Sequence, residues 1–371
     1  MRNLHKFLIL TFLLSIGFIL SCKKDKKSAE FDSPQMFLDI TKNVILPNIS
    51  AFKSDVTKLK SVLQILKNNP TEATLQGAQN QLVNTSENWH RCEFFNLGEV
   101  KNSFIYLKIN TWPTNTTKLL EHVVGSETLS SSFIDKSGSS VKGLPAIEYL
   151  LFDNVNGNQA VLDSLLTSVN ASRKLEYLLA LGSNLEQQSI KLEEIWTGGY
   201  ALTFVGNKDE GFGGSLALLI NEISHKTEHV VLSKIREPLN LLGNPAVNIV
   251  FAESFRSGKS LSHIKNNLNT LEACFKGSYS DPETIGLYDL LQSSAGEDIL
   301  ISEVKIKITT QINKLQILMN DYPESYEETF DISGINLSDF YDEWRNLLVL
   351  IKVDMPHELG VAITISDNDG D

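Results

Sequence analysis

The sequence predicts an all-α protein made of two helical-bundle domains. Apolar residues recur at spacings of three and four along most of the chain, which is the period of an amphipathic helix. Strand patterns are nearly absent, apart from a short alternating stretch at 360–366. Six glycines within residues 197–215 interrupt the helical pattern near its middle. We therefore expect an N-terminal domain over residues 34–205 and a C-terminal domain over residues 206–371.

The first 33 residues are expected to serve targeting. A basic start precedes an apolar run of 14 residues, the length of a signal-peptide core and too short to cross a bilayer. The run ends in Ser21-Cys22, which resembles the lipobox of bacterial lipoproteins. This predicts a signal peptide over 1–21, an acylated Cys22 and a polar tether over 22–33. The alternative is an ordinary secretion signal with an incidental cysteine.

Start signals and apolar spacing place the helices in order. Ser33-Pro34 is typical of an N-cap followed by a proline at the first helical position, and Pro47 should kink or end that helix. Asn69-Pro70-Thr71-Glu72 repeats the signal, with Glu72 expected to complete a capping box. Helical spacing then recurs over 159–196, 214–242, 260–276, 295–319 and 337–354.

Composition excludes some classes of function. The chain is 42% hydrophobic and 21% charged, as in ordinary globular proteins, and its net charge is −12. A duplex-binding surface needs clustered Lys and Arg, so we expect no nucleic-acid partner. With Cys22 acylated, Cys92 and Cys274 remain; they could form a disulfide, but we favour two buried free thiols.

The stretch GLPAIEYLLF at 143–152 contains the first candidate site residue, Glu148, within an otherwise apolar run. A carboxylate among apolar neighbours is costly unless it has a partner. Glu148 could stabilise the N-terminus of its own helix. It could instead line a pocket and receive a cation or a hydrogen-bond donor.

These residues resemble a known family. GLPAIEYLL is similar to the Gly-x-His-x-x-Glu signature of imelysin-like proteins, which are bacterial lipoproteins and periplasmic proteins linked to iron uptake. Further similar segments follow in order: WHRCEFF at 89–95, INTWP at 109–113, FRSGKS at 255–260 and LGVAITISDNDGD at 359–371. The resemblance implies two four-helix-bundle domains with the signature at their interface. GLYDLL, beginning at Gly286, shares its Gly-Leu start and its apolar spacing with GLPAIEYLL, which would fit an internal duplication.

One position departs from the family pattern. Pro145 stands where the metal-binding or peptidase-like version carries histidine, and proline offers no ligand atom. The resemblance would still bring Glu93 and Glu148 to the interface, as ligands of iron or another divalent metal. His90 could supply a nitrogen ligand, or it could be a packing histidine.

A rival motif is His225-Lys-Thr-Glu228-His229, which fits the His-x-x-Glu-His pattern of one class of zinc proteases. Glu303 could then be a third ligand. Those proteases have mixed α/β folds, whereas the surroundings here are helical. We therefore expect a bundle helix whose apolar face uses Leu219, Ile223, Val230 and Ile235, and the charged residues between these positions should form a solvated face.

Three functions remain open. The leading one is a periplasm-facing lipoprotein, with the outer membrane favoured, that binds a metal, metal chelate or small ligand between its domains and works with an iron-uptake system. Arg256 would offer a cation and Trp112 an aromatic wall, although both could be core residues. The second is an imelysin-type metallopeptidase, which the loss of histidine at Pro145 disfavours. The third is a structural or partner-docking lipoprotein.

Overall fold

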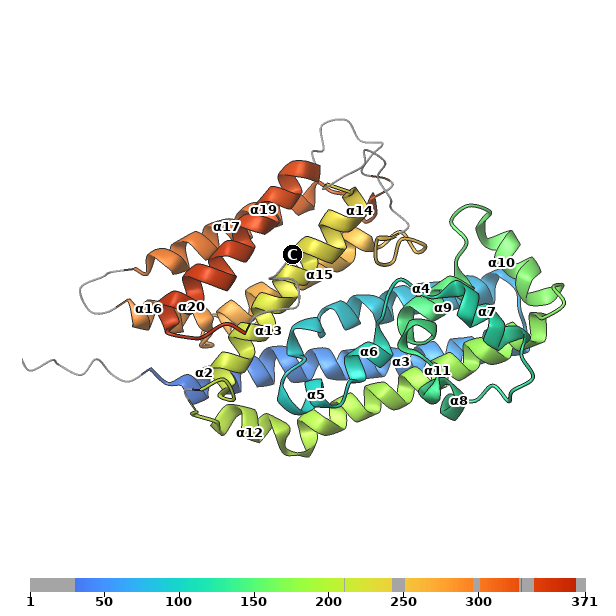
Figure 1. The fold of residues 1–371 in the computed structure, drawn as a ribbon, viewed down its shortest axis with the longest axis horizontal. Coiled ribbons are helices and arrows are strands. Elements are labelled where there is room, and N and C mark those ends of the chain that lie inside the picture. Colours follow the sequence, from blue (N-terminus) through green and yellow to red (C-terminus); the bar gives the residue numbers. More distant parts are fainter. Residues whose placement is uncertain are drawn as a thin grey trace, which may run out of the picture.

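The computed structural model describes residues 31–209, 211–241, 251–295, 301–326, 328 and 337–364. Throughout these residues the regular structure is helical and there are no strands, so the all-α prediction is confirmed (Figure 1). Within the same ranges no helix is long and apolar enough to cross a membrane. The predicted signal peptide, Cys22 and most of the tether lie outside the described residues, as does the end of the alternating stretch at 360–366.

The first half of the chain is built around three long helices that run side by side, α3, α4 and α11 (Figure 1). Trp89, near the end of α4, is buried with its ring 5.2 Å from that of Phe52 on α3 and 4.7 Å from that of Tyr106. The elements of this half are α2 Ser33–Ile40, η1 Thr41–Ile45, α3 Leu46–Asn68, α4 Glu72–His90, η2 Glu93–Phe95, α5 Gly98–Asn102, α6 Ile105–Ile109, α7 Thr116–Val124, α8 Ser131–Lys136, η3 Ser139–Val141, α9 Gly143–Leu151, α10 Gly157–Leu166, α11 Ala171–Ile195, η4 Trp196–Tyr200 and α12 Ala201–Gly206.

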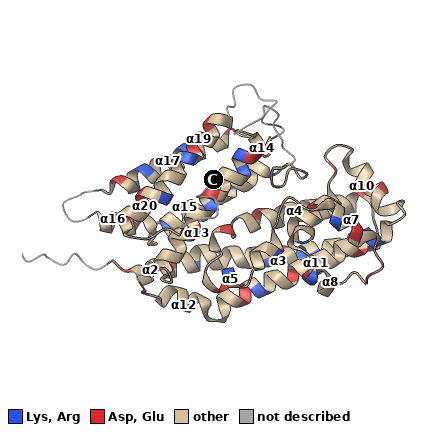
Figure 2. Cartoon of the chain, viewed as in Figure 1, with Lys and Arg blue, Asp and Glu red and all other residues tan. Residues whose placement is uncertain are grey.

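The second half lies along one side of the first (Figure 1). Its helix α13 packs on η2, and α15 packs on both α4 and η2, so the end of α4 is covered by the second half. The elements of the second half are α13 Ser215–His229, η5 Val230–Arg236, α14 Glu237–Leu239, α15 Ser260–Lys276, α16 Leu287–Ser294, α17 Glu303–Asn320, α19 Leu337–Val349, η7 Leu350–Asp354 and α20 Met355–Leu359. Figure 2 shows acidic and basic residues spread over both halves.

Three local expectations change. Pro47 does not end its helix: it is the second residue of α3, where its missing N–H is not needed, and the irregularity is the π-helical turn η1 just before it. Thr74, and not a glutamate, completes the capping box with Thr71. Gly198 and Gly199 lie in the turn η4, where Gly199 has a non-helical φ of +135° that kinks the chain; helix α12 then follows directly and ends at Gly206. The predicted boundary between domains at 205/206 stays a prediction.

Candidate functional site

The two halves meet at the loop 251–259, which precedes α15. Trp112 of the first half donates from its Nε1 to the carbonyl oxygen of Phe251, over 3.2 Å. Glu253 and Ser257 of the same loop bond to first-half side chains described below. The loop therefore connects the region around the signature to the second half.

Glu148 lies on α9 and makes its bonds across this junction. Its Oε1 accepts from the backbone N–H of Ser257 over 2.9 Å and from the Ser257 hydroxyl over 2.7 Å. Glu148 is the sixth residue of α9, so it does not cap its own helix. Burial raises the pKa of the Glu148 carboxyl, and the two bonds from Ser257 partly offset this rise. Glu148 therefore acts as a hydrogen-bond acceptor for Ser257 of the second half.

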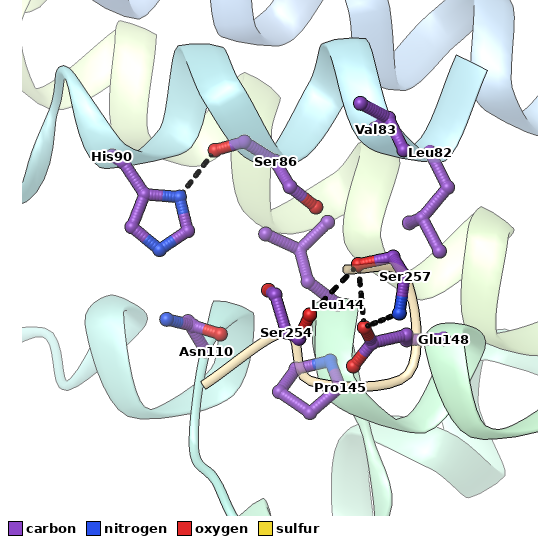
Figure 3. Close-up of a pocket in the computed structure, with 10 residues that line it drawn as sticks. All are labelled: Leu82, Val83, Ser86, His90, Asn110, Leu144, Pro145, Glu148, Ser254 and Ser257. Carbon is purple, nitrogen blue, oxygen red and sulfur yellow. Dashed lines mark hydrogen bonds between the residues drawn. The ribbon is translucent and has the colours of Figure 1, made fainter. Parts of the chain in front are cut away.

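A small cavity separates Glu148 from His90 (Figure 3). Its volume is about 10 Å³, which is room for roughly one water molecule. In Figure 3, Glu148 and Ser257 lie at one end, His90 and Asn110 lie at the other, and Pro145 forms part of the wall. The remaining lining residues are Leu82, Val83, Ser86, Leu144 and Ser254.

Beyond His90 lies a buried cluster of charges. Lys234, from η5, has its Nζ 2.6 Å from Oε2 of Glu93 and 2.9 Å from Oε2 of Glu253. The same Nζ donates to Oδ1 of Asn267 over 2.9 Å. Asn267 in turn donates to Glu93 Oε2 over 2.8 Å and to the carbonyl oxygen of His90 over 2.7 Å. All five side chains are at least nine-tenths buried.

The cluster keeps its groups charged in spite of burial. Burial alone would raise the pKa of Glu93 and Glu253, but the Lys234 ammonium, with help from His90, lowers the pKa of both. The pKa of Glu253 is held well below its usual range. For Lys234, burial opposes the charge, yet Glu253 and Glu93 raise its pKa. Two carboxylates and one ammonium therefore coexist at the interface.

His90 connects the charge cluster to the small cavity. Its Nδ1 is 2.6 Å from the carbonyl oxygen of Ser86, and its Nε2 is 3.1 Å from Oε1 of Glu253. Asn110 donates to the same Oε1 over 2.5 Å. The ring of His263 stacks on His90 at 3.8 Å between centroids. Neither nitrogen of His263 has a hydrogen-bond partner among the described residues, and burial keeps its pKa well below the usual range.

The cluster contains a set of atoms that could hold a metal ion. One ligand atom each from His90, Glu93 and Glu253 lies within 4.8 Å of the other two. Imidazole nitrogen and carboxylate oxygen suit zinc, iron and similar ions. However, the Lys234 ammonium already forms salt bridges with both carboxylates. A cation beside it would meet a buried like charge, so the residues as folded do not fit a metal.

A much larger cavity opens between the halves on another side of α13. Its volume is about 570 Å³, within the range of small-molecule sites. Glu222 lines it, is 4% exposed, and has no hydrogen-bond partner for its Oε1 in the described part of the chain. Burial raises the pKa of Glu222 to about 7, although Lys226 and Lys101 oppose the rise. Other lining residues are Asn96, Leu97, Gly98, Lys101, Phe212, Ala217, Leu218, Asn221, Ser224, His225, Glu228, Lys352, Ile363 and Thr364. We call this cavity the interdomain cleft.

The zinc-protease pattern does not assemble. His225 lines the interdomain cleft, whereas His229 packs edge-on against the Trp112 ring at 5.0 Å. Glu228 pairs with Lys352 over 2.8 Å, and Glu303 is exposed near Lys307. The only metal-ligating group among the described residues is the His90 set.

The prediction that the charged residues of this helical segment form a solvated face is also wrong. Glu222, Glu228 and Lys234 are all buried, because the first half and α19–η7 cover them.

The candidate residues predicted from the sequence thus lie in four different places. His90, Pro145 and Glu148 share the small cavity, and His90 also joins Glu93 in the charge cluster. Trp112 lies against His229, outside both. Arg256 lies 5.0 Å from the ring of Tyr149 and lines a different cavity of about 310 Å³.

Sequence reasoning missed Glu253, Lys234 and Asn267. Glu253 follows Phe251-Ala252 and precedes Phe255, so it carries the same signal as Glu148: a carboxylate among apolar residues. Lys234 gave no such signal, because its burial depends on which elements cover η5.

The thiols are as expected. Cys92 and Cys274 are free and buried, and burial raises the pKa of both, to about 12 for Cys274. Neither is poised as a nucleophile.

Comparison with known proteins identifies the family. Residues 45–338 match the family described as Imelysin, a peptidase family by classification. Because the match covers most of the chain, the protein belongs to the imelysin family, as its motifs indicated.

Two solved structures share the fold. One is a protein from Parabacteroides distasonis named as an iron-regulated protein A precursor, at 18% identity and a TM-score of 0.73, covering 91% of this chain and 97% of that one. The other is an imelysin-like protein from Psychrobacter arcticum, at 18% identity and a TM-score of 0.69, covering 90% and 97%. A search of curated proteins gives no match.

Proposed function

We propose that this protein has a role in iron acquisition and binds a small polar ligand, an iron chelate, in the interdomain cleft. Membership of the imelysin family and the name of one structural neighbour support an iron-related role. We choose this site because the cleft is large and because Glu222, a buried residue that lines it, has an oxygen without a hydrogen-bond partner among the described residues.

The size of each cavity favours a chelate over a bare ion. The cavity beside Glu148 admits roughly one water, and Lys234 fills the charge cluster. The interdomain cleft has a volume of about 570 Å³ and polar groups from both halves. A ligand bound there would contact both halves at once, as expected of a receptor that signals occupancy to a partner.

The cleft also constrains the chemistry of the ligand. A buried carboxylate without a partner is costly, so Glu222 favours a ligand that donates a hydrogen bond or carries an ammonium group. Lys101 and His225 lie in the same wall and could meet acceptor groups of the ligand. A chelate with both donors and acceptors, such as a ferric hydroxamate with a free amine, matches this arrangement.

Peptidase activity is less well supported. Metal-assisted hydrolysis needs an ion with an open coordination position. Pro145 removes the signature nitrogen, Glu148 is bonded to Ser257, and Lys234 pairs with Glu93 and Glu253.

Calorimetric titration of a fragment starting at residue 31 tests the binding proposal. We expect it to bind a ferric hydroxamate bearing a free amine, and Glu222→Gln to weaken binding at least ~10-fold, the loss of one charged hydrogen bond. Glu303→Gln, at an exposed site, is the matched control. If no chelate binds, or if Glu222→Gln binds as well as the wild type, the proposal fails and a partner-docking role becomes the better account.

We also propose that acylated Cys22 anchors the protein to the outer membrane, facing the periplasm, beside components of an iron-uptake system. Multiple acyl chains would make this attachment stable. Labelling of growing cells with a radioactive fatty acid should mark the wild type and Ser28→Ala but not Cys22→Ala, and the labelled protein should fractionate with the outer membrane. Label on Cys22→Ala, or none on the wild type, would refute the lipid anchor.

A further inference from the structure

The ammonium group of Lys234 is surrounded by oxygen atoms, as a bound metal cation would be. Its ammonium donates to Oε2 of Glu93 and to Oδ1 of Asn267, over 2.6 and 2.9 Å, and it forms a salt bridge with Oε2 of Glu253 at 2.9 Å. The side chain is 2% exposed. The ammonium is thus surrounded by three oxygen atoms, two of which belong to carboxylates.

The same two carboxylates belong to the group of residues that could hold a metal. Glu93 and Glu253 belong to the group whose ligand atoms lie within 4.8 Å of one another, and His90 is its third member. The three come from the end of α4, from η2 and from the loop before α15, so they meet only when both halves are folded. Lys234 comes from a fourth element, η5.

Several nitrogen atoms beside the ammonium lack hydrogen-bond partners. Nε2 of His90 has none apart from its contact with Glu253, and neither nitrogen of His263 has one within the described ranges. Both rings are 1% exposed and stack at 3.8 Å. Buried polar atoms normally find partners, so this cluster has more ligand capacity than Lys234 uses.

We infer that Lys234 is an internal substitute for a metal ion, and that removing its side chain opens a divalent-metal site made by His90, Glu93 and Glu253. With the lysine present, its positive charge offsets the negative charge of Glu93 and Glu253, and no metal ion is needed. Without it, two buried carboxylates face one another, and a divalent cation of the kind that nitrogen and oxygen ligands hold restores the balance. This inference is independent of ligand binding in the interdomain cleft.

The test uses Co²⁺, whose visible spectrum reports its coordination. The fragment starting at residue 31 is prepared as wild type, Glu253→Gln, Lys234→Ala and Lys234→Ala/Glu253→Gln, and each is dialysed against Co²⁺. We expect no retained cobalt in the wild type, one equivalent in Lys234→Ala, and loss of that equivalent in the double variant. Affinity for Co²⁺ should rise at least ~100-fold on removing the lysine, and removing one ligand should reverse most of the gain.

Thermal unfolding with and without Co²⁺ gives a second readout. Lys234→Ala alone should be strongly destabilised, because it leaves two buried carboxylates without their cation, and Co²⁺ should raise its melting temperature but not that of the double variant. The double variant keeps one carboxylate and is the control for folding. The inference is overturned if Lys234→Ala binds no cobalt, if it stays unfolded with the metal present, or if the wild type retains cobalt that Glu253→Gln releases.

Discussion

At the scale of single residues, buried carboxylates define the interface, and their partners decide what each one does. Glu148 receives two bonds from Ser257, and Glu93 and Glu253 share the Lys234 ammonium. Glu222 has an oxygen without a partner among the described residues. The first three are satisfied within the protein, whereas Glu222 remains available to a ligand.

Glu148 should tolerate loss of its charge but not loss of its acceptor. Glu148→Gln can keep an oxygen opposite Ser257, whereas Glu148→Ala leaves a buried N–H unpaired. We expect Glu148→Ala to lower the free energy of unfolding by about 1–3 kcal/mol and Glu148→Gln by less. Urea unfolding of both variants measures this, and equal losses would mean that the bonds to Ser257 do not stabilise the junction.

Glu222 should make stability fall as the pH rises. Its folded-state pKa, about 7, lies above the value of 4.5 for an exposed glutamate, so the folded protein binds the extra proton between these pH values. Stability should therefore decline from about pH 4.5 to pH 7 and stay lower above it, by at most ~3 kcal/mol. Glu222→Gln removes this penalty, so it should be more stable than the wild type at pH 8 and similar at pH 4. If urea unfolding gives the wild type and Glu222→Gln the same change of unfolding free energy with pH, the raised pKa of Glu222 is contradicted.

Residues differ in how far the sequence reveals them. Glu148 could be singled out because an apolar context makes a carboxylate conspicuous, whereas Glu93 was indicated by the family resemblance. Lys234 and Glu222 were assigned to a solvated face, since a charged residue between apolar helical positions normally faces water. They are buried because the opposite half covers that face, which is information that helical periodicity does not contain.

At the scale of elements, helix α9 depends on a glycine at its first residue. Gly143 has a φ of +74°, and a Cβ there would lie 2.1 Å from the carbonyl oxygen of Ile109. The signature glycine thus allows α9 to begin directly against α6, which places Pro145 and Glu148 at the small cavity.

Gly143 and Gly157 make a matched pair for testing this contact. Gly157 has the same φ of +74° but open space where a Cβ would be. Gly157→Ala should cost about 1 kcal/mol through backbone strain alone, and Gly143→Ala at least ~2 kcal/mol more through the clash. Denaturant unfolding compares them. A similar loss for both would show that α9 can move away from α6 easily.

The elements themselves were predictable where the apolar spacing was long and regular. Helices α4 and α15 fall where the spacing placed them, whereas the stretch expected to be helical over 159–196 is divided into α10 and α11. Most of α3 was not predicted, because the first helix was expected to kink or end at Pro47. The π-helical turn η1 was not predictable, because it keeps helical spacing. The glycines at 198 and 199 did mark an irregularity: Gly199 has a φ of +135° and kinks the chain, although helix α12 follows directly.

At the scale of the whole molecule, the second half of the chain completes the site. α15 and the loop before it bring Asn267, His263, Glu253 and Ser257 to the end of α4 and to α9. The resemblance indicated an interface site, but it could not show that a lysine of η5 would lie within it. The account's central claim is that this ammonium is the cation of the buried cluster.

Anomalous diffraction from crystals of the wild-type fragment soaked in Mn²⁺ tests that claim most directly. We predict density for Lys234 Nζ between Glu93 and Glu253 and no manganese peak within bonding distance of either carboxylate. A fully occupied manganese peak bonded to Glu93, Glu253 and His90, with the lysine moved away, would contradict it.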